Sequence, residues 1–279
     1  MTTSSPGRLV LVGTPIGNLG DIAPRAAAAL GAADLVCCED TRRTGRLLEH
    51  LGVRAGGLKV VNDHTEERVV GEVLDRLGRG EVVAVVSDAG MPGVSDPGER
   101  LVAAAVDAGH LVEVVPGPSA AVTALVGSGL PTGRFAFEGF LPRKGSGRTE
   151  RIAVVAVDRR TTVLYEAPHR LARTIEQLHA ACGPARRVVI ARELTKLHEE
   201  FWRGTLEEAV ARVAAVEPRG EHVIVLDGAP VPDEVDDGAI VAALTAERSA
   251  GASTRDAVAG VAAALGVPKR RVYDLATRA

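Results

Sequence analysis

Aromatic residues and cysteines are scarce in this chain of 279 residues. Phe, Trp and Tyr together make up 3% of the sequence, so most of the core must be built from Val, Leu and Ala. The three cysteines, Cys37, Cys38 and Cys182, are too few for a disulfide framework, and their spacing is not that of metal ligands. These features indicate free thiols, buried or half-buried, in a reducing compartment.

Long apolar runs and a strong net charge are also absent. No run approaches the ~20 apolar residues that cross a membrane, and the first residues, MTTSSPGR, lack the basic and apolar segments of a secretory signal. The net charge of −3 does not indicate a nucleic-acid binder, although a local basic patch can act on a chain that is acidic overall. With 46% hydrophobic and 25% charged residues the composition is typical of a globular protein. We expect a cytoplasmic protein that is long enough for two modest domains, or for one large domain with an appendage.

Apolar strands alternate with helices in the first half of the chain. This alternation predicts a mostly parallel sheet that helices cover on both faces, in an N-terminal α/β domain over residues 1–131. Asp21 is the expected N-cap of the first helix. The predicted strands are 9–12, 35–38, 58–61, 82–86 and 111–115, and the predicted helices are 23–30, 44–51, 65–77, 97–108 and one that follows the PGPSA segment.

The second half of the chain has a different pattern. Strands outnumber helices over residues 132–229, which predicts a C-terminal α/β domain built on a mixed sheet. The segment 230–238 is rich in Pro and Asp and indicates a linker. Residues 239–279 end in a helix, a Gly-Val-Pro turn and a second helix, a pattern that resembles a helix-turn-helix.

Three glycine- and proline-rich loops follow predicted strands: GTPIGNLGD, SDAGMPGVSDPG and PGPSA. None of them matches the dinucleotide or Walker A patterns. Taken singly, each is also compatible with a plain strand-to-helix turn, in which Asp88 or Ser119 only caps a helix. Because the carboxyl ends of parallel strands lie at one edge of a sheet, we expect the three loops to converge and to form a ligand site there.

Charged motifs lie near the other strand ends: CEDTRRTG, HTEER, YEAPHR and ARELTKLHEE. For these motifs, solvated helix starts and structural ion pairs are as compatible with the pattern as catalysis is. The LPRKGSGR segment is basic and rich in Gly and Ser, which suits a phosphate backbone but also an ordinary surface loop. No set of His, Cys, Asp or Glu has the spacing of a metal site, so we expect no metal.

The motifs together resemble, in the same order, those of the tetrapyrrole methylase-like (class III) S-adenosylmethionine-dependent methyltransferases. The segments that carry the resemblance run from LVGTPIGNLGDI to GEHVIVL, about residues 9–228, and include SDAGMPGVSDPG, FEGFLPRKG and YEAPHR. GTPIGNLGDI and FLPRKG are most similar to the branch of the family that acts on RNA. The resemblance implies two α/β domains with S-adenosyl-L-methionine in the cleft between them, and a homodimer. It also implies 2′-O-methylation of a cytidine ribose in the decoding centre of 16S rRNA, within the small ribosomal subunit.

The resemblance also implies a set of cofactor-binding residues. Carried over onto this sequence they are Pro15, Asp88, Ala89, Gly90, Met91, Ser95, Ser119, Ala120, Tyr165, Glu166, Ala167, Glu221 and His222.

A ribose hydroxyl is a poor nucleophile, so a general base near the acceptor would help the methyl transfer. The sequence leaves the choice of base open among Glu39, Asp40, His64, Glu166, His169 and Lys196. The expected RNA phosphate contacts are Arg42, Arg43, Arg143, Lys144, Arg148 and Arg170.

Two other functions remain compatible with the sequence. A methyltransferase of the same class could act on a small tetrapyrrole-like macrocycle, which predicts a deep apolar trough and no need for a basic loop. A non-enzymatic RNA-binding protein could use Lys269, Arg270 and Arg271 in the C-terminal helices, although a cofactor cleft would then have no purpose. The C-terminal helices themselves are as compatible with a packing cap as with an RNA contact.

Overall fold

A computed structural model describes residues 6–62, 65–230 and 235–278. The chain divides into two compact units, Met1–Ala229 and Pro230–Ala279. Within the described ranges, no helix combines the length and the apolar character that crossing a membrane requires. The predicted boundary at residue 131, between two α/β domains within the first unit, stays a prediction.

The first sheet has five strands, and all of its strand pairs are parallel, as the alternation of strands and helices predicted. The strand order is β3-β2-β4-β1-β5. The strands β4, β1 and β5 are therefore neighbours, and the three glycine-rich loops leave the same edge of the sheet. The strand bounds are β1 Arg8–Val12, β2 Leu35–Cys38, β3 Leu58–Val60, β4 Val82–Val85 and β5 Leu111–Val115.

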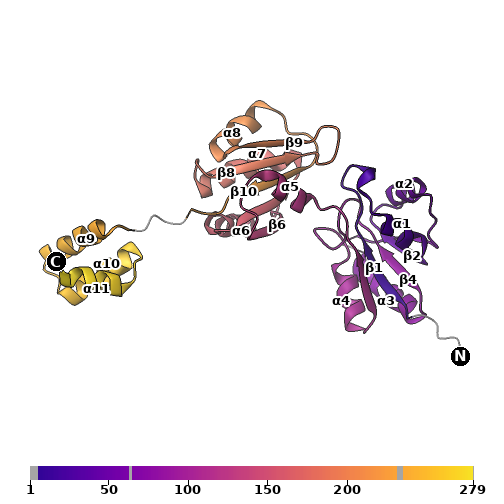
Figure 1. Cartoon of the computed structure of the whole chain (residues 1–279), viewed down its shortest axis with the longest axis horizontal. Coiled ribbons are helices and arrows are strands. Elements are labelled where there is room, and N and C mark those ends of the chain that lie inside the picture. The colour runs from indigo at the N-terminus through magenta and orange to yellow at the C-terminus, as the bar shows by residue number, and fades with distance from the viewer. Residues whose placement is uncertain (1–5, 63–64, 231–234, 279) are drawn as a thin grey trace. The chain divides into compact units, whose positions relative to one another are not determined.

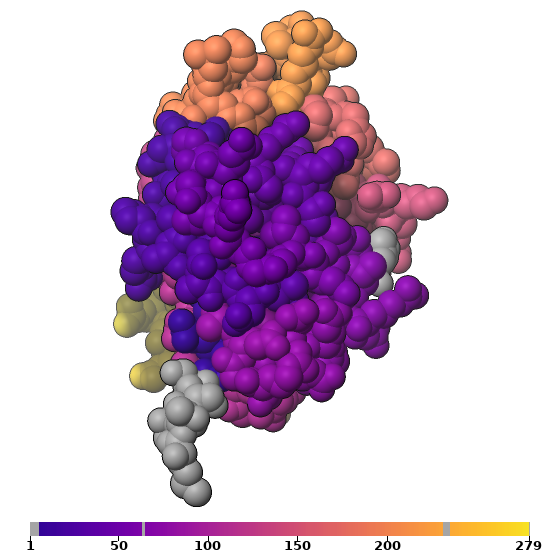
Figure 2. All heavy atoms as spheres, turned by 90° about the vertical axis from the view of Figure 1, so that its right-hand side faces the viewer, coloured from indigo at the N-terminus to yellow at the C-terminus, as the bar shows by residue number. Residues whose placement is uncertain are grey.

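Helices cover both faces of this sheet (Figure 1). Side chains alternate along each strand, so Val10 packs with α1 (Pro24–Gly31) and α2 (Thr41–Leu51), whereas Leu9 packs with α3 (Glu66–Gly78) and α4 (Glu99–Asp107). The helices and loops of this half form the continuous indigo-to-purple surface in Figure 2.

The predicted N-cap of the first helix is wrong. Asp21 lies in a short 3-10 helix, Leu19–Asp21, and α1 begins at Pro24 after Ala23, which makes no side-chain cap. Proline at the first helical position has no N–H to satisfy, so the helix starts there without a capping side chain.

The second sheet is mixed, as predicted, with the order β6-β7-β10-β8-β9. β6 and β7 are parallel, and the remaining pairs are antiparallel. The strand bounds are β6 Phe135–Phe140, β7 Thr161–Glu166, β8 Arg187–Arg192, β9 Glu200–Thr205 and β10 His222–Leu226.

One face of the second sheet packs against α6 (Ser146–Val157), α7 (Pro168–Cys182) and α8 (Leu206–Ala215). The opposite face packs against α5 (Ala120–Ser128), through Ala121, Ala124 and Leu125. Helix α5 directly follows the PGPSA loop of the first sheet, so this loop connects the first sheet to the second.

The second unit is a bundle of three helices, α9 (Asp237–Ser249), α10 (Thr254–Leu265) and α11 (Lys269–Arg278), with its own apolar core. The predicted helix-turn-helix corresponds to α10 and α11. Helix α9 was not predicted as a helix: it starts at Asp237, inside the acidic segment assigned to the linker, where the Asp236 side chain accepts the Ala239 N–H.

Candidate functional site

The three glycine-rich loops meet, as the parallel sheet requires. The Thr14 N–H donates to the Gly90 carbonyl over 2.9 Å, and the Gly90 N–H donates to the Thr14 carbonyl over 3.2 Å. A Cβ atom on Gly13 would lie 2.6 Å from the Gly117 Cα, so only glycine allows this approach of the first and third loops.

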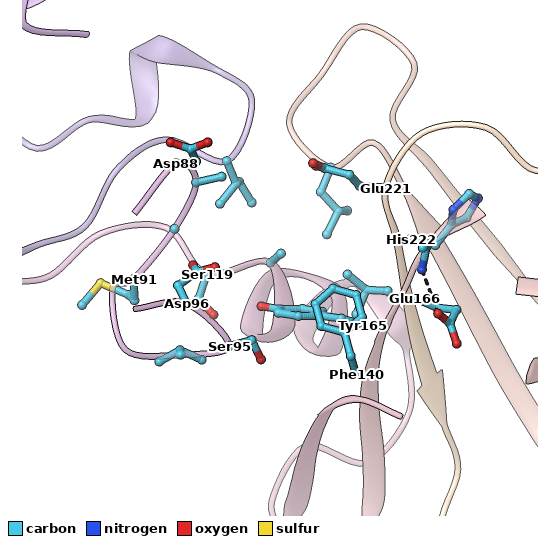
Figure 3. A pocket seen from close by; sticks show the side chains of 18 of the residues that line it. Asp88, Met91, Ser95, Asp96, Ser119, Phe140, Tyr165, Glu166, Glu221 and His222 are labelled. Carbon is cyan, nitrogen blue, oxygen red and sulfur yellow. Dashed lines mark hydrogen bonds between the residues drawn. The ribbon is translucent and has the colours of Figure 1, made fainter. Parts of the chain in front are cut away.

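A cavity of about 350 Å³, here called cavity A, lies beside these loops. In Figure 3, Asp88 and Met91 lie on one side of it and Glu221 and His222 on the other, with Tyr165 nearer the middle. Every predicted cofactor-binding residue except Pro15 lines cavity A. The structure thus gathers this predicted set at one place, and the binding role of each residue stays a prediction.

Carboxylates dominate the charged groups of cavity A. Arg43 is the one arginine or lysine among the lining residues of the described chain, and His222 is the one histidine. Burial, reinforced by nearby Arg192, lowers the pKa of His222, so its ring is neutral at pH 7. Cavity A therefore favours a cationic ligand. The lining carboxylates are Glu39, Asp88, Asp96, Glu166 and Glu221.

An aromatic wall completes cavity A. The Tyr165 ring lies edge-on to the Phe140 ring, with 5.6 Å between the centroids. The Tyr165 hydroxyl accepts the Ala121 N–H at the start of α5, over 3.2 Å, which joins β7 to the third loop. Burial raises the pKa of Tyr165, so the phenol stays protonated. The wall can hold a flat apolar group, and the carboxylates can hold a charged one.

Asp88 lies at the end of β4 and is held on two sides. Its backbone N–H donates to Glu39 Oε1 over 2.9 Å, and its Oδ2 lies 3.3 Å from Arg43 Nη1. Its Oδ1 is buried and has no hydrogen-bond partner within the described part of the chain. A buried acceptor without a partner is costly, so Asp88 is poised to accept a hydrogen bond from a ligand.

A second cavity, cavity B, also measures about 350 Å³. It shares part of its wall with cavity A and contains Pro15, the remaining predicted cofactor residue. Its own lining is basic, with Arg46 and Lys196 in addition to Arg43. The residues common to both cavities are Ile16, Arg43, Asp88, Ala89 and Glu221.

The geometry argues against several of the proposed bases. Hydrogen bonds from Arg42 lower the pKa of Asp40 to about 2, so this carboxylate is a weak base, and it lines neither cavity. His169 lies in the first turn of α7, also outside both cavities. His64 lies outside the described residues. Glu39 remains at cavity A, where its carboxylate holds the Asp88 backbone.

Lys196 is fixed in its protonated form. Its Nζ donates to Glu221 Oε2 over 2.8 Å and to Glu193 Oε1 over 3.0 Å. Burial lowers the pKa of Lys196, but these hydrogen bonds outweigh it and raise the pKa overall. A lysine held in this way supplies positive charge at cavity B rather than a basic lone pair.

Glu166 is a buried structural anchor. Its carboxylate accepts hydrogen bonds from the Ala167 N–H and the Thr174 hydroxyl, and it forms an ion pair with Arg170 at 3.1 Å. In Figure 3 the carboxylate points away from the middle of cavity A. These three partners occupy the acceptor positions that a general base would need.

Two predicted phosphate contacts belong to the same buried network. Arg148 was expected in a basic surface loop, but it lies in α6, is 2% exposed, and donates to Gln177, Thr174 and the Pro142 carbonyl. Arg170 donates to the Leu141 carbonyl. Arg148 is thus unavailable to RNA, because its guanidinium holds the two ends of the LPRKGSGR segment together.

The other predicted phosphate contacts are accessible. Arg143 and Lys144 are exposed in the loop that Arg148 and Arg170 anchor, and Arg42 is exposed on α2. Arg43 lines both cavities.

One residue that supports the site was missed. Glu66 is 4% exposed, and its Oε1 accepts the backbone N–H groups of Gly98, Arg100 and Leu101 at the start of α4. A sequence signal was available, because Glu66 shares the helical face of Val69 and Val73, which is buried. Within the described residues no group of three His, Cys, Asp or Glu side chains could hold a metal ion.

Known proteins of one family are similar to this chain over most of its length. Residues 8–210 match the family described as Tetrapyrrole (Corrin/Porphyrin) Methylases. A protein named ribosomal RNA small subunit methyltransferase I from Mycobacterium tuberculosis is 48% identical over 273 residues, which cover 97% of this chain and 94% of the relative. A protein of the same name from Synechocystis is 47% identical over 227 residues and 81% of each chain.

A solved structure has the same fold. It is that of a uroporphyrin-III C-methyl transferase from Thermus thermophilus, complexed with S-adenyl homocysteine. The match has a TM-score of 0.56 at 25% identity and covers 79% of this chain and 97% of that chain.

Proposed function

The chain belongs to the tetrapyrrole (corrin/porphyrin) methylase family, and on this premise we propose that it methylates small-subunit ribosomal RNA with S-adenosyl-L-methionine as the methyl donor. More narrowly, we propose that the acceptor is the 2′-hydroxyl of a cytidine ribose in the decoding centre of 16S rRNA. This substrate implies a cytoplasmic protein. The similarity to relatives named as rRNA methyltransferases, over 97% of the chain, supports RNA over a macrocycle as the acceptor.

The charge and shape of cavity A are the main support for S-adenosyl-L-methionine as the methyl donor. S-adenosyl-L-methionine has a positively charged sulfur and an ammonium group, and the carboxylates of cavity A complement both. The wall formed by Phe140 and Tyr165 suits the adenine ring. The residues of cavity A therefore fit this cofactor.

When bound, the cofactor supplies a methyl carbon that its sulfonium makes electrophilic. The residues of this chain then have three tasks: to hold the reacting atoms in line, to exclude water, and to remove the hydroxyl proton. Asp88 borders both cavities and carries a free acceptor oxygen, so we assign it the last task, with Glu39 fixing its backbone. Lys196 and Arg43 supply positive charge for the phosphate groups of the RNA.

The decisive experiment is methylation of small ribosomal subunits that lack the modification. Purified protein and isotopically labelled S-adenosyl-L-methionine should place a 2′-O-methyl group on one cytidine, which nucleotide mapping identifies. Methylation of a tetrapyrrole-like macrocycle in place of RNA would contradict the proposal.

A cavity-filling variant tests the donor site separately. Ala120→Phe should fill cavity A and abolish the heat of S-adenosyl-L-methionine binding in calorimetry. Ala103→Phe, the same change at an exposed position of α4, is the matched control and should bind the donor normally. Unchanged donor binding by Ala120→Phe would show that cavity A is not the donor site.

The exposed basic loop tests the RNA contact. The double variant Arg143→Ala, Lys144→Ala should weaken RNA binding and leave donor binding unchanged, because these side chains lie in neither cavity. An equal loss of RNA and donor binding would show that this loop is not a specific RNA contact.

We also propose a homodimer, which the outer face of α5 supports. Helix α5 carries apolar residues on both of its faces: Ala124 packs on the second sheet, while Val122 and Val126 are 48% and 66% exposed. A helix that is apolar all round is usually buried. Val126→Glu should yield monomers in sedimentation velocity, whereas Val106→Glu on the surface of α4 should not. Monomeric wild-type protein at micromolar concentration would contradict the proposal.

A further inference from the structure

We propose that cavity B is the acceptor site, which takes one ribonucleotide and its flanking phosphate out of the RNA strand. This inference rests on the proposed function and assigns the second of the two adjoining cavities, where Pro15 is the one predicted cofactor residue that lines cavity B alone. It divides the site into a donor half, cavity A, and an acceptor half, cavity B.

The two cavities differ in the sign of their charge. Cavity A has a carboxylate-rich lining with one guanidinium. Cavity B has three cationic side chains, Arg43, Arg46 and Lys196, against the two carboxylates of Asp88 and Glu221. A sulfonium donor favours the lining that is rich in carboxylates, and a phosphodiester favours the lining that adds Arg46 and Lys196, so the charges of the two linings favour different ligands.

The positive charge of cavity B is fixed in place. Lys196 is held by two carboxylates, one of which, Glu221, belongs to the shared wall. Arg43 reaches Asp88, also in the shared wall, over 3.3 Å. Arg46 is exposed and lies one turn further along α2, beside Leu47, and both residues line cavity B alone.

The shared wall is where donor and acceptor can meet. Asp88 and Ala89, at the end of β4, line both cavities, so ligands in A and B face each other across these residues. A volume of about 350 Å³ suits a single nucleoside with its phosphate. A base paired within a helix cannot enter such a space, so the acceptor must be an unstacked, single-stranded nucleotide.

Two variants of α2 test the assignment, with small ribosomal subunits as substrate. Arg46→Ala should raise the KM for the subunit by about tenfold and reduce the salt dependence of RNA binding by roughly one phosphate contact, with the donor Kd unchanged. Arg25→Ala removes an exposed arginine from the neighbouring helix α1 and should change the KM by less than about twofold. Equal effects of the two substitutions would reduce the role of Arg46 to general surface charge and overturn the proposal.

Leu47→Trp should block cavity B by size. We expect it to lose methyl transfer and to lose affinity for a single-stranded RNA trinucleotide with a central cytidine, measured by fluorescence anisotropy, while donor binding and Tm stay as in the wild type. Glu49→Trp, on the exposed side of the same helix, is the matched control. Loss of donor affinity in Leu47→Trp, or normal trinucleotide binding, would overturn the assignment. Failure of the wild type to methylate subunits, with trinucleotide binding still blocked by Leu47→Trp, would instead contradict the proposed function alone.

Discussion

Replacing Glu66 with alanine should destabilise the loop that forms one side of cavity A. The Glu66 carboxylate accepts three backbone N–H groups, from Gly98 at 3.0 Å, Arg100 at 3.0 Å and Leu101 at 3.1 Å. No side chain of the preceding loop caps α4, so Glu66, reaching across from α3, performs that role. The loop itself carries Ser95 with φ +62°, a conformation that non-glycine residues adopt at a cost and only when their surroundings hold them.

The magnitude follows from the burial of the groups that Glu66→Ala leaves unpaired. The hydrogen bonds from Gly98 and Leu101 are buried, and each unsatisfied buried N–H costs about 1–3 kcal/mol. The lost charge at the N-terminus of α4 adds roughly 0.3–1 kcal/mol. We expect a loss of about 3–5 kcal/mol in the free energy of unfolding, which for a unit of this size lowers Tm by roughly 10 °C. Glu66→Gln keeps an acceptor oxygen and should lose about 1 kcal/mol.

Urea denaturation of the full-length protein, followed by tryptophan fluorescence, measures this effect. Glu67→Ala is the matched control: the Glu67 side chain is 86% exposed and lies 3.6 Å from Arg100, so its loss should cost less than about 1 kcal/mol. Because Val94, Ser95 and Asp96 line cavity A, the Kd for S-adenosyl-L-methionine should also rise in Glu66→Ala. A Glu66→Ala protein as stable as Glu67→Ala would refute the idea that this carboxylate holds the loop.

Three further outcomes are expected. Arg148→Met removes one buried and two partly buried hydrogen bonds and should lower the free energy of unfolding in urea by about 2–4 kcal/mol; a change below about 1 kcal/mol would mean that Arg148 anchors nothing. Burial lowers the pKa of His222 below its ordinary value of 6.5, so below that pH the unfolded chain binds a proton that the folded chain does not. Stability should therefore fall as pH decreases from about 6.5, and His222→Gln should remove this pH dependence of Tm. If the wild type and His222→Gln show the same pH dependence, the buried His222 is not its cause. Burial raises the pKa of Cys37 to about 12, so iodoacetamide at pH 8 should label it only after unfolding, and mass-spectrometric detection of rapid labelling in the native protein would be the contrary result.

Local sequence patterns were sufficient to predict the two sheets. Strand β1 carries four consecutive apolar residues, Leu9 to Val12, because both faces of a parallel strand are buried, and a helix follows each such strand within a short distance. Parallel strands joined by helices must end at one edge, so the meeting of the three glycine-rich loops also followed from the sequence. Gly13 and Gly117 are required by that meeting, since a side chain on either would collide with the other loop.

Only the tertiary structure decided the roles of individual charged residues. Arg148 and Arg143 occur in the same basic segment, yet Arg148 turns into the core because Gln177 and Thr174 of α7 offer it acceptors there. The sequence left Glu166 among the candidate bases. In the structure its carboxylate is bound by Thr174 and Arg170, which lie further along the chain.

The sequence by itself determined the fold class and the neighbourhood of the site, because periodicity and glycine placement are local properties, and its motifs carried the resemblance to the family. The tertiary structure alone decided how that neighbourhood divides into an acidic and a basic cavity, since the sign of the field in each depends on side chains from distant segments, such as Arg46 and Lys196. The same holds for Glu66, whose carboxylate supports a helix more than thirty residues away in sequence. Charges act through space, and their distances are set only when the chain has folded.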